Sequence, residues 1–311
     1  MVSPSLFRIS LNHNPKPAEV LPSLSVNGMI QASFAPYGSP MTIQSFCSVQ
    51  SREAAEALAG TADRVDVWLM LEYRGVWRPK VATDHDLDAA TRTWLDALLA
   101  EYRVNGLAAR LQMIKQRSSG ELRLFTIQNN VTKVRSAPDY GSLITASDQA
   151  AEGVNYFVCT HGQRDLCCAE FGLPVYRALR ERVQDRVWQT SHLGGHRFAA
   201  NVLVAPNATL YGRVTPQDLD ALLLATENGL LHRPLARGRT CYAPEVQAAE
   251  ILSGLDTSLE SVERLGEQQW RVRFVTGTVG VVARGIISMA SCGDERGKPS
   301  LEYVLTQVPN G

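Results

Sequence analysis

The sequence lacks several features that would assign it to a common class. Its 31 Lys and Arg residues are balanced by 31 Asp and Glu among 311 residues, so it has no basic excess of the kind that nucleic-acid binders and polybasic membrane binders carry. No apolar run approaches the roughly 20 residues that a membrane-spanning helix needs. The first residues also lack a charged segment followed by an apolar core, so no signal peptide is predicted. We therefore expect a cytoplasmic protein whose partners include neither nucleic acid nor a membrane.

Two cysteine motifs are also missing. There is no Cys-x-x-Cys, the motif that thioredoxin-type thiol exchange usually employs. There is no Cys-x₂-Cys-His box downstream either, so a true Rieske domain is not predicted. Six cysteines in a chain of this length, in a reducing compartment, argue against a disulfide framework. Three of them (Cys159, Cys167 and Cys168) fall close together, and clustered thiols in such a compartment indicate metal or redox chemistry.

The pattern of residues divides the chain into four parts. A loosely ordered segment at 1–40 is rich in Ser, Pro and Asn, and an α/β part follows at 41–149. The part that carries the chemistry spans 150–239, and a small α+β appendix spans 240–311. With 45% hydrophobic residues the chain can bury at least one sizeable core, and no internal repeat is evident.

Local patterns predict the main elements. In the first α/β part these are a buried strand at 65–73, an amphipathic helix at 84–101, a hairpin at 108–128 and a polar linking stretch at 132–150. In the third part they are a strand at 155–160, a helix at 174–183 that begins at Pro174, and a second strand at 187–191. A hairpin at 198–214 and a helix at 215–229, capped by Thr215, follow. The order β-α-β-β-α in this part matches a thioredoxin-like half-fold.

Cys159, Cys168, His192 and His196 form the candidate site. Cys159 ends a predicted strand, and loops at strand ends are where a sheet presents ligands. The spacing of His192 and His196 would suit one face of a helix, but the two glycines between them, each costing about 1 kcal/mol in a helix, favour a loop around a metal. Two thiolates and two imidazoles fit either zinc or a [2Fe–2S] cluster, and the wide gap between the cysteines favours the cluster.

At these positions the sequence resembles the sucraseferredoxin-like family. The resemblance rests on Cys159-Thr-His-Gly-Gln-Arg164-Asp165-Leu-Cys-Cys168, on His192-Leu-Gly-Gly-His196-Arg-Phe-Ala-Ala-Asn201 and on Tyr211-Gly212-Arg213. It covers roughly 41–240 and matches the family pattern Cys-x₈-Cys followed by His-x₃-His. It implies an α/β fold, namely a thioredoxin-like ferredoxin domain with an N-terminal α/β half and a small C-terminal α+β appendix. Fungal actin-patch-distribution proteins belong to this family.

The resemblance implies a [2Fe–2S] cluster as cofactor, with Cys159 and Cys168 on one iron and His192 and His196 on the other. The protein would then be a one-electron carrier or redox sensor for an unidentified redox protein, rather than a catalyst with its own substrate. Because imidazole can exchange a proton, we expect the transfer to be proton-coupled, and a reduction potential that stayed flat from acidic to alkaline pH would count against this.

The neighbouring residues receive lesser roles. Side chains and glycines around the ligands are expected to support the site: Arg164, Asp165, Gly194, Gly195 and Arg197. His161 is interpreted as a hydrogen-bonding loop residue and Cys167 as a spectator thiol. Three cysteines lack ligand spacing and are interpreted as ordinary small residues: Cys47, Cys241 and Cys292. Two alternative functions stay open, a structural zinc protein with a Cys₂His₂ site and a thiol-redox protein using Cys167 and Cys168.

Overall fold

The computed structural model describes residues 46–116, 120–255, 258–288, 291–292 and 297–307. Its α-helices are α1 (Cys47–Glu53), α2 (Ala89–Val104), α3 (Tyr140–Thr145), α4 (Leu166–Val183), α5 (Leu219–Glu227) and α6 (Pro244–Ser253). Its first ten strands are β1 (Val67–Glu72), β2 (Ala109–Lys115), β3 (Leu122–Gln128), β4 (Val131–Ala137), β5 (Gln149–Ala150), β6 (Asn155–Cys159), β7 (Val187–Thr190), β8 (Val202–Ala205), β9 (Thr209–Tyr211) and β10 (Ala236–Arg239). The last four are β11 (Leu259–Gly266), β12 (Gln269–Phe274), β13 (Gly277–Ser288) and β14 (Lys298–Thr306). The predicted N-terminal segment at 1–40 lies outside the described residues.

Ten strands form one sheet in the order β10-β9-β8-β6-β7-β2-β1-β3-β4-β5. It consists of two units with the same topology. In the first, β1 and β2 are parallel and joined through α2, β3 pairs antiparallel to β1, β4 pairs with β3, and α3 follows. In the second, β6, α4, β7, β8, β9 and α5 repeat this arrangement. The sequence shows no matching repeat, so the duplication is visible only in the topology.

The second unit has the predicted order of strand, helix, strand, hairpin and helix, which is β6-α4-β7-β8-β9-α5, and β6 lies between β7 and β8 in the sheet. The predicted fold class is therefore confirmed. The two units meet where β2 pairs antiparallel to β7, at Ile114 with Thr190 and Lys115 with Gln189.

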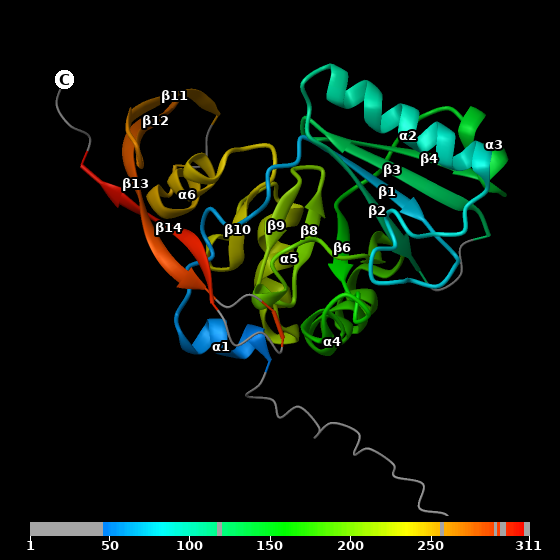
Figure 1. The fold of residues 1–311 in the computed structure, drawn as a ribbon, viewed down its shortest axis with the longest axis horizontal. Helices are drawn as coiled ribbons and strands as arrows, with labels where there is room; N and C mark the ends of the chain where they lie inside the picture. Colours follow the sequence, from blue (N-terminus) through cyan, green and yellow to red (C-terminus); the bar gives the residue numbers. More distant parts are fainter. Residues whose placement is uncertain (1–45, 117–119, 256–257, 289–290, 293–296, 308–311) are drawn as a thin grey trace, which may run out of the picture. The chain divides into compact units, whose positions relative to one another are not determined.

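The core is built in layers around the two half-sheets (Figure 1). α2 and α3 pack on one face of the first half, and α4 and α5 pack on one face of the second. The other two faces share one hydrophobic cluster, in which the Phe125 ring lies 5.6 Å from that of Phe157 and 5.4 Å from that of Trp188. The two half-sheets therefore face each other across apolar side chains, and Cys159 and Cys168 belong to this shared cluster.

The C-terminal part is a four-stranded antiparallel sheet in the order β11-β12-β13-β14, packed against α6. This agrees with the predicted α+β appendix. Val272, Phe274, Val281 and Ala283 bring its inner face into the core of the second unit. No helix in the described part of the chain has the length and apolar character that crossing a bilayer requires.

Predictions from strong local patterns are confirmed. The buried strand predicted at 65–73 forms β1, in which all six residues from Val67 to Glu72 are buried. The predicted hairpin across Asn207 joins β8 to β9. Thr215 and Asp218 form the predicted capping box, since Asp218 Oδ2 accepts the Thr215 N–H at 2.8 Å.

Three predictions in the two units are wrong. β2 and β3 are not a hairpin, because β1 lies between them in the sheet. The stretch 132–150 is not merely a polar linker, since it holds most of β4, all of α3 and β5, and the polar side chains of β4 alternate with more buried ones. α4 begins at Leu166 rather than Pro174, because Asp165 caps it two turns earlier and the helix tolerates the missing N–H of Pro174.

Candidate metal centre

The two predicted cysteine ligands lie at the end of β6 and in the first turn of α4. Cys159 is the last residue of β6, and both it and Cys168 are only 1% exposed. Asp165 positions the second thiol, because its carboxylate accepts the N–H of Cys167 at 2.9 Å and caps the helix. The Cys-x₈-Cys spacing thus spans a strand end, a short loop and a helix start, and the two thiols meet in the apolar layer between the half-sheets.

α4 approaches the end of β6 closely because residue 172 is glycine. A Cβ on Gly172 would lie 2.1 Å from the carbonyl oxygen of Cys159 and 3.1 Å from its carbonyl carbon. Both contacts are with backbone atoms, which cannot rotate away as a flexible side chain could. The glycine therefore fixes the distance between the helix that carries Cys168 and the strand that carries Cys159.

We expect Gly172→Ala to push α4 away from β6. Overpacking against a fixed backbone costs about 1–3 kcal/mol, so the free energy of unfolding should fall by at least that range, as measured in urea. Bound metal per chain should fall as well, because the two thiols separate. Gly120→Ala is the matched control, since a Cβ there meets no atom within 4 Å. Equal effects of the two substitutions would contradict this role of Gly172.

The predicted histidine ligands lie on a tight loop after β7, as the two glycines between them predict. Gly194 and Gly195 have φ angles of +91° and +66°, in the left-handed region that glycine adopts at little cost. Arg237 Nη1 donates to the Gly194 carbonyl at 3.0 Å, and Asn201 Nδ2 donates to the Gly195 carbonyl at 2.9 Å. The loop is therefore held in one conformation by hydrogen bonds from the core side.

Arg237 anchors this loop to the segment before β1. It is 2% exposed and also donates to the Thr61 carbonyl at 2.5 Å, to Thr61 Oγ1 at 3.0 Å and to Asn201 Oδ1 at 2.8 Å. Burial lowers the pKa of Arg237 to about 9. A buried guanidinium is unfavourable unless it is hydrogen-bonded, so these contacts are what keep it there. Sequence analysis missed this residue, which lies more than 40 positions after the glycines.

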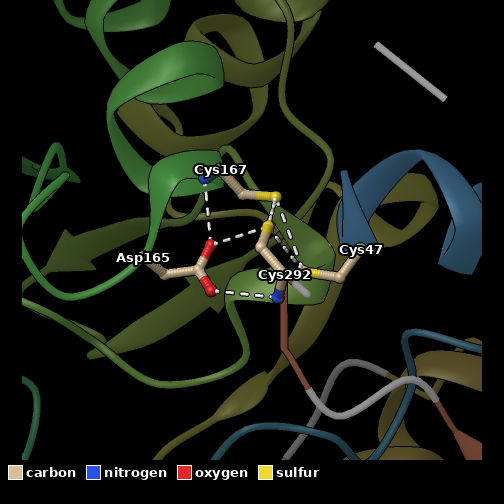
Figure 2. A group of neighbouring side chains, drawn as sticks. All are labelled: Cys47, Asp165, Cys167 and Cys292. Atoms are coloured by element: carbon tan, nitrogen blue, oxygen red, sulfur yellow. Dashed lines mark hydrogen bonds between the residues drawn. The ribbon is translucent and has the colours of Figure 1, made fainter. Parts of the chain in front are cut away.

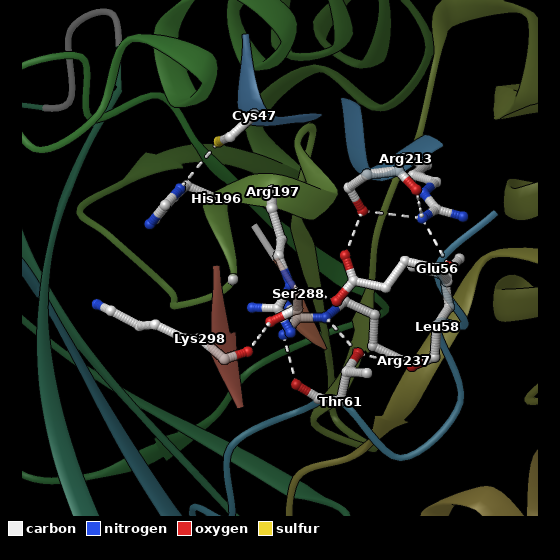
Figure 3. A network of polar contacts seen from close by, with 12 residues as sticks. Cys47, Glu56, Leu58, Thr61, His196, Arg197, Arg213, Arg237, Ser288 and Lys298 are labelled. Atoms are coloured by element: carbon white, nitrogen blue, oxygen red, sulfur yellow. Dashed lines mark hydrogen bonds and ion pairs between the residues drawn. The ribbon is translucent and has the colours of Figure 1, made fainter. Parts of the chain in front are cut away.

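The two histidine rings lie side by side but face different neighbours. His192 Nδ1 lies 3.5 Å from Cys168 Sγ, and the donor atoms of Cys159, Cys168 and His192 all lie within 4.8 Å of one another. The His196 ring is centred 5.5 Å from the His192 ring. Its Nδ1 faces Asp165 Oδ2 at 3.2 Å and Cys47 Sγ at 3.2 Å, as Figure 3 shows for Cys47. The structure thus brings three predicted ligands together and places the fourth beside them.

The two buried thiols form a pair with one favoured thiolate. A hydrogen bond from Cys168 holds the pKa of Cys159 well below its usual value, and His192 and the backbone N–H of His161 lower it further. The same bond raises the pKa of Cys168, so the contact favours the thiolate form at Cys159 rather than at Cys168. Thiolates are the form that binds metals, so Cys159 is prepared for a metal before one arrives.

His161 and Arg164 line the approach to His192. His161 Nε2 lies 3.0 Å from the Arg78 carbonyl, as expected for a hydrogen-bonding loop residue, and burial lowers its pKa. Arg164 is exposed. Together with Lys80 and Ser191 these residues line an open groove of about 200 Å³ that reaches His192. The site is therefore closed on the cysteine side and open on the histidine side.

Arg197 does not face the predicted ligands as a free charge. Its Nε lies 2.6 Å from Glu56 Oε1, and its guanidinium lies 4.4 Å from the centre of the Phe198 ring. Arg213 donates to the Glu56 carbonyl at 2.6 Å and to the Ser51 carbonyl at 3.0 Å (Figure 3). These contacts hold α1 against the short helical turn at His196–Phe198. Arg197 therefore supports the site by positioning α1, because Glu56 already balances its charge.

A second group of thiols lies beside His196, and sequence analysis missed it. Cys167 Sγ lies 3.5 Å from Cys47 Sγ and 3.1 Å from Cys292 Sγ (Figure 2). The interpretation of Cys47 and Cys292 as scattered residues and of Cys167 as a spectator is therefore wrong about their surroundings. They lie 120 and 125 positions from Cys167, so no spacing pattern connects them. Because Cys167 faces this group while Cys168 faces Cys159, the adjacent cysteines do not form a thiol pair.

The profile of the sucrase/ferredoxin-like family matches residues 58–238, which is more than half of the chain and includes all four predicted ligands. This chain belongs to that family. The matched region begins just before Thr61 and ends just after Arg237, so it spans both topological units and the residues that hold the histidine loop. The resemblance inferred from the sequence is confirmed.

Among curated proteins, the sucrase/ferredoxin-like chain is similar to two yeast proteins called altered inheritance of mitochondria protein 32. The protein from Meyerozyma guilliermondii is 33% identical over 92 residues, which are 26% of this chain and 33% of that protein. The protein from Debaryomyces hansenii is 32% identical over 92 residues, 26% of this chain and 34% of that protein. The match thus spans about a third of the length of these relatives.

Among solved structures, the chain is similar to a thioredoxin-like [2Fe–2S] ferredoxin from Aquifex aeolicus. The sequence identity is 24%, the match covers 28% of this chain and 91% of the ferredoxin, and the TM-score is 0.25. A cysteine-to-serine variant of that ferredoxin gives 21% identity, 27% and 96% coverage and a TM-score of 0.25.

Proposed function

We propose that this protein binds a [2Fe–2S] cluster through Cys159, Cys168, His192 and His196 and transfers single electrons. The observation that carries the proposal is the convergence of two buried thiols and two adjacent imidazoles at one end of β6. Two thiolate and two imidazole donors are the ligand set of a mixed-ligand [2Fe–2S] centre. Such a cluster would supply reversible one-electron reduction.

Each ligand is prepared for its role by its surroundings. The lowered pKa of Cys159 favours the thiolate that a metal would bind, and a bound metal would replace the hydrogen bond that raises the pKa of Cys168. His196 Nδ1 faces Asp165 Oδ2 at 3.2 Å, so a cluster would have to be bound through the other ring nitrogen, Nε2. A carboxylate that holds the second nitrogen of a ligating histidine fixes its tautomer and ring orientation. The aromatic layer around Cys159 excludes water from the sulfur ligands.

The open side of the site suits electron exchange. His192 faces the groove lined by Lys80 and Arg164, whereas both cysteines are buried. A redox partner that approaches this groove would reach an imidazole ligand without opening the core. Because neutral imidazole carries no charge and thiolate does, the histidine side should also be the easier side to reduce. The proton coupling expected from the sequence stays a prediction.

The decisive experiment is anaerobic purification followed by iron and acid-labile sulfide analysis and EPR spectroscopy of the reduced protein. We expect a red-brown protein with iron and sulfide in equal amounts and a signal that appears on reduction. Zinc without sulfide at this site would replace the proposal with the structural zinc alternative. Turnover of insulin disulfides after removal of the iron would support the thiol-redox alternative instead.

A further inference from the structure

Three thiols from distant parts of the chain meet at one point on the other side of His196. Cys47 is the first residue of α1, Cys167 lies in the first turn of α4, and Cys292 follows β13. Their sulfur atoms are 3.1 Å, 3.5 Å and 3.6 Å apart, so they form a nearly equilateral triangle. All three are free cysteines. Figure 2 shows their sulfur atoms directed at one another.

The carboxylate of Asp165 is a fourth possible ligand beside the three thiols. Its Oδ1 lies 3.3 Å from Cys292 Sγ, and its Oδ2 accepts the Cys292 N–H at 3.4 Å. The ligand atoms of Cys47, Asp165, Cys167 and Cys292 all lie within 4.8 Å of one another. The Asp165 side chain is only 5% exposed, so its carboxylate faces the thiols rather than solvent.

The surroundings of the group are apolar. Cys47 and Cys167 are fully buried and pack with Phe46 and Ala199 in a small cluster that Cys292 also touches. Ser48 Oγ donates to Cys167 Sγ at 3.3 Å. One disulfide could join only two of the three cysteines and would leave the third as a thiol. Hydrogen bonds between thiols are weak. A positive ion at the centre would satisfy all of them at once.

We propose that Cys47, Cys167, Cys292 and Asp165 bind a single zinc ion at a site separate from the iron–sulfur centre. Zn–S bonds of about 2.3 Å place sulfur ligands about 3.8 Å apart in a tetrahedral site, which is about 0.2 to 0.7 Å more than the observed 3.6, 3.5 and 3.1 Å. The space between the sulfur atoms suits one ion rather than a cluster. Thiolates with one carboxylate suit Zn²⁺ better than Cu⁺, which prefers sulfur alone.

The zinc site would join three segments that are far apart in the sequence. It would link α1 and the segment after β13 to the first turn of α4, beside the iron ligand Cys168. His196 Nδ1 lies 3.2 Å from both Cys47 Sγ and Asp165 Oδ2, so a proposed iron ligand would be in direct contact with two of the zinc ligands. The zinc proposal itself rests only on the four ligands and stands whether or not iron binds on the other side.

The test is metal analysis of the purified full-length chain and of matched cysteine variants, with zinc, iron and sulfide measured separately. We expect one zinc per chain in the wild type. Cys47→Ser and Cys292→Ser should each lose most of the zinc and keep iron and sulfide. Cys159→Ser should show the reverse. Cys241→Ser is the control, because Cys241 belongs to neither group, and it should keep all three.

A second measurement covers the case in which the variants do not fold. In the folded wild type, iodoacetamide should modify Cys292, the partly exposed member of the group, only after a zinc chelator is added, as read by peptide mass spectrometry. The proposal is overturned if the wild type takes up no Zn²⁺ under reducing conditions. It is also overturned if Cys47→Ser and Cys292→Ser both keep full zinc. A disulfide between two of the three cysteines that persists when the wild-type protein is kept under reducing conditions would overturn it as well.

Discussion

Replacing His192 or His196 with alanine is expected to abolish or strongly change the visible absorption of the purified protein. Each substitution removes one of two nitrogen ligands, and a [2Fe–2S] cluster with an incomplete ligand set is lost or rearranged. His192→Ala should be the more severe change, because His192 already lies in contact with the thiol pair. Iron, sulfide and the EPR signal should fall together in both variants.

His232→Ala is the matched control for the two histidines. His232 is half-buried near the end of α5, and its backbone N–H contacts Tyr211 rather than any predicted ligand. This variant should keep its colour. If His192→Ala and His196→Ala both retained wild-type iron, sulfide and spectra, the histidine ligands would be wrong and the proposed function would fall with them.

Cysteine substitutions at the same positions add a finer test. His192→Cys and His196→Cys replace a neutral ligand by a thiolate, which stabilises the oxidised cluster. We expect the reduction potential to fall by on the order of 100 mV or more, in the direction of all-cysteine ferredoxins. A cluster that is retained with an unchanged potential would show that the substituted histidine does not bind iron.

Arg237→Met is expected to have the second large effect, on both stability and metal content. The substitution keeps much of the side-chain volume but leaves the Gly194 carbonyl, the Thr61 carbonyl and Asn201 Oδ1 without their buried donor. Each buried unsatisfied polar group costs about 1–3 kcal/mol, so we expect a loss of about 3 kcal/mol in the free energy of unfolding, measured in urea. The histidine loop should also lose its fixed conformation, and iron per chain should fall.

Arg284→Met controls for the change in charge and size. Arg284 is exposed on β13, in the C-terminal sheet, and its replacement should change stability by less than about 0.5 kcal/mol. If Arg237→Met left both the stability and the iron content at the level of Arg284→Met, the hydrogen bonds to the histidine loop would not be what holds the site together.

The parts of the fold that were predictable are those specified by neighbouring residues. The apolar run of β1, the β8–β9 hairpin and the Thr215 capping box each depend on a few consecutive positions. The pairing of β2 was not predictable in this way. The sequence Ser118-Ser119-Gly120 predicts that two neighbouring strands form a hairpin, but in the sheet β1, not β3, lies next to β2.

The candidate site likewise contains residues that short motifs predict and residues that they do not. Short motifs carry Cys159, Cys168, His192 and His196, which stay predicted ligands, and the glycines between the histidines correctly predicted a loop. Arg237 and the group around Cys47 were not found, because their roles depend on contacts between segments that only the folded chain brings together. Asp165 was expected to support the site, but its contacts with Cys292 and His196 could not be predicted from its position beside Cys167.

The antiparallel junction between β2 and β7 affects how the protein can meet other molecules. In an isolated β-α-β-β-β-α unit, β7 would be an outer strand with unpaired backbone groups, and such a strand readily recruits another chain. Here the unit that carries no predicted ligand occupies that edge. The unit that carries the predicted ligands is thus shielded from strand addition along β7 by the first unit, and we expect partners to bind through side-chain contacts around the opening at His192.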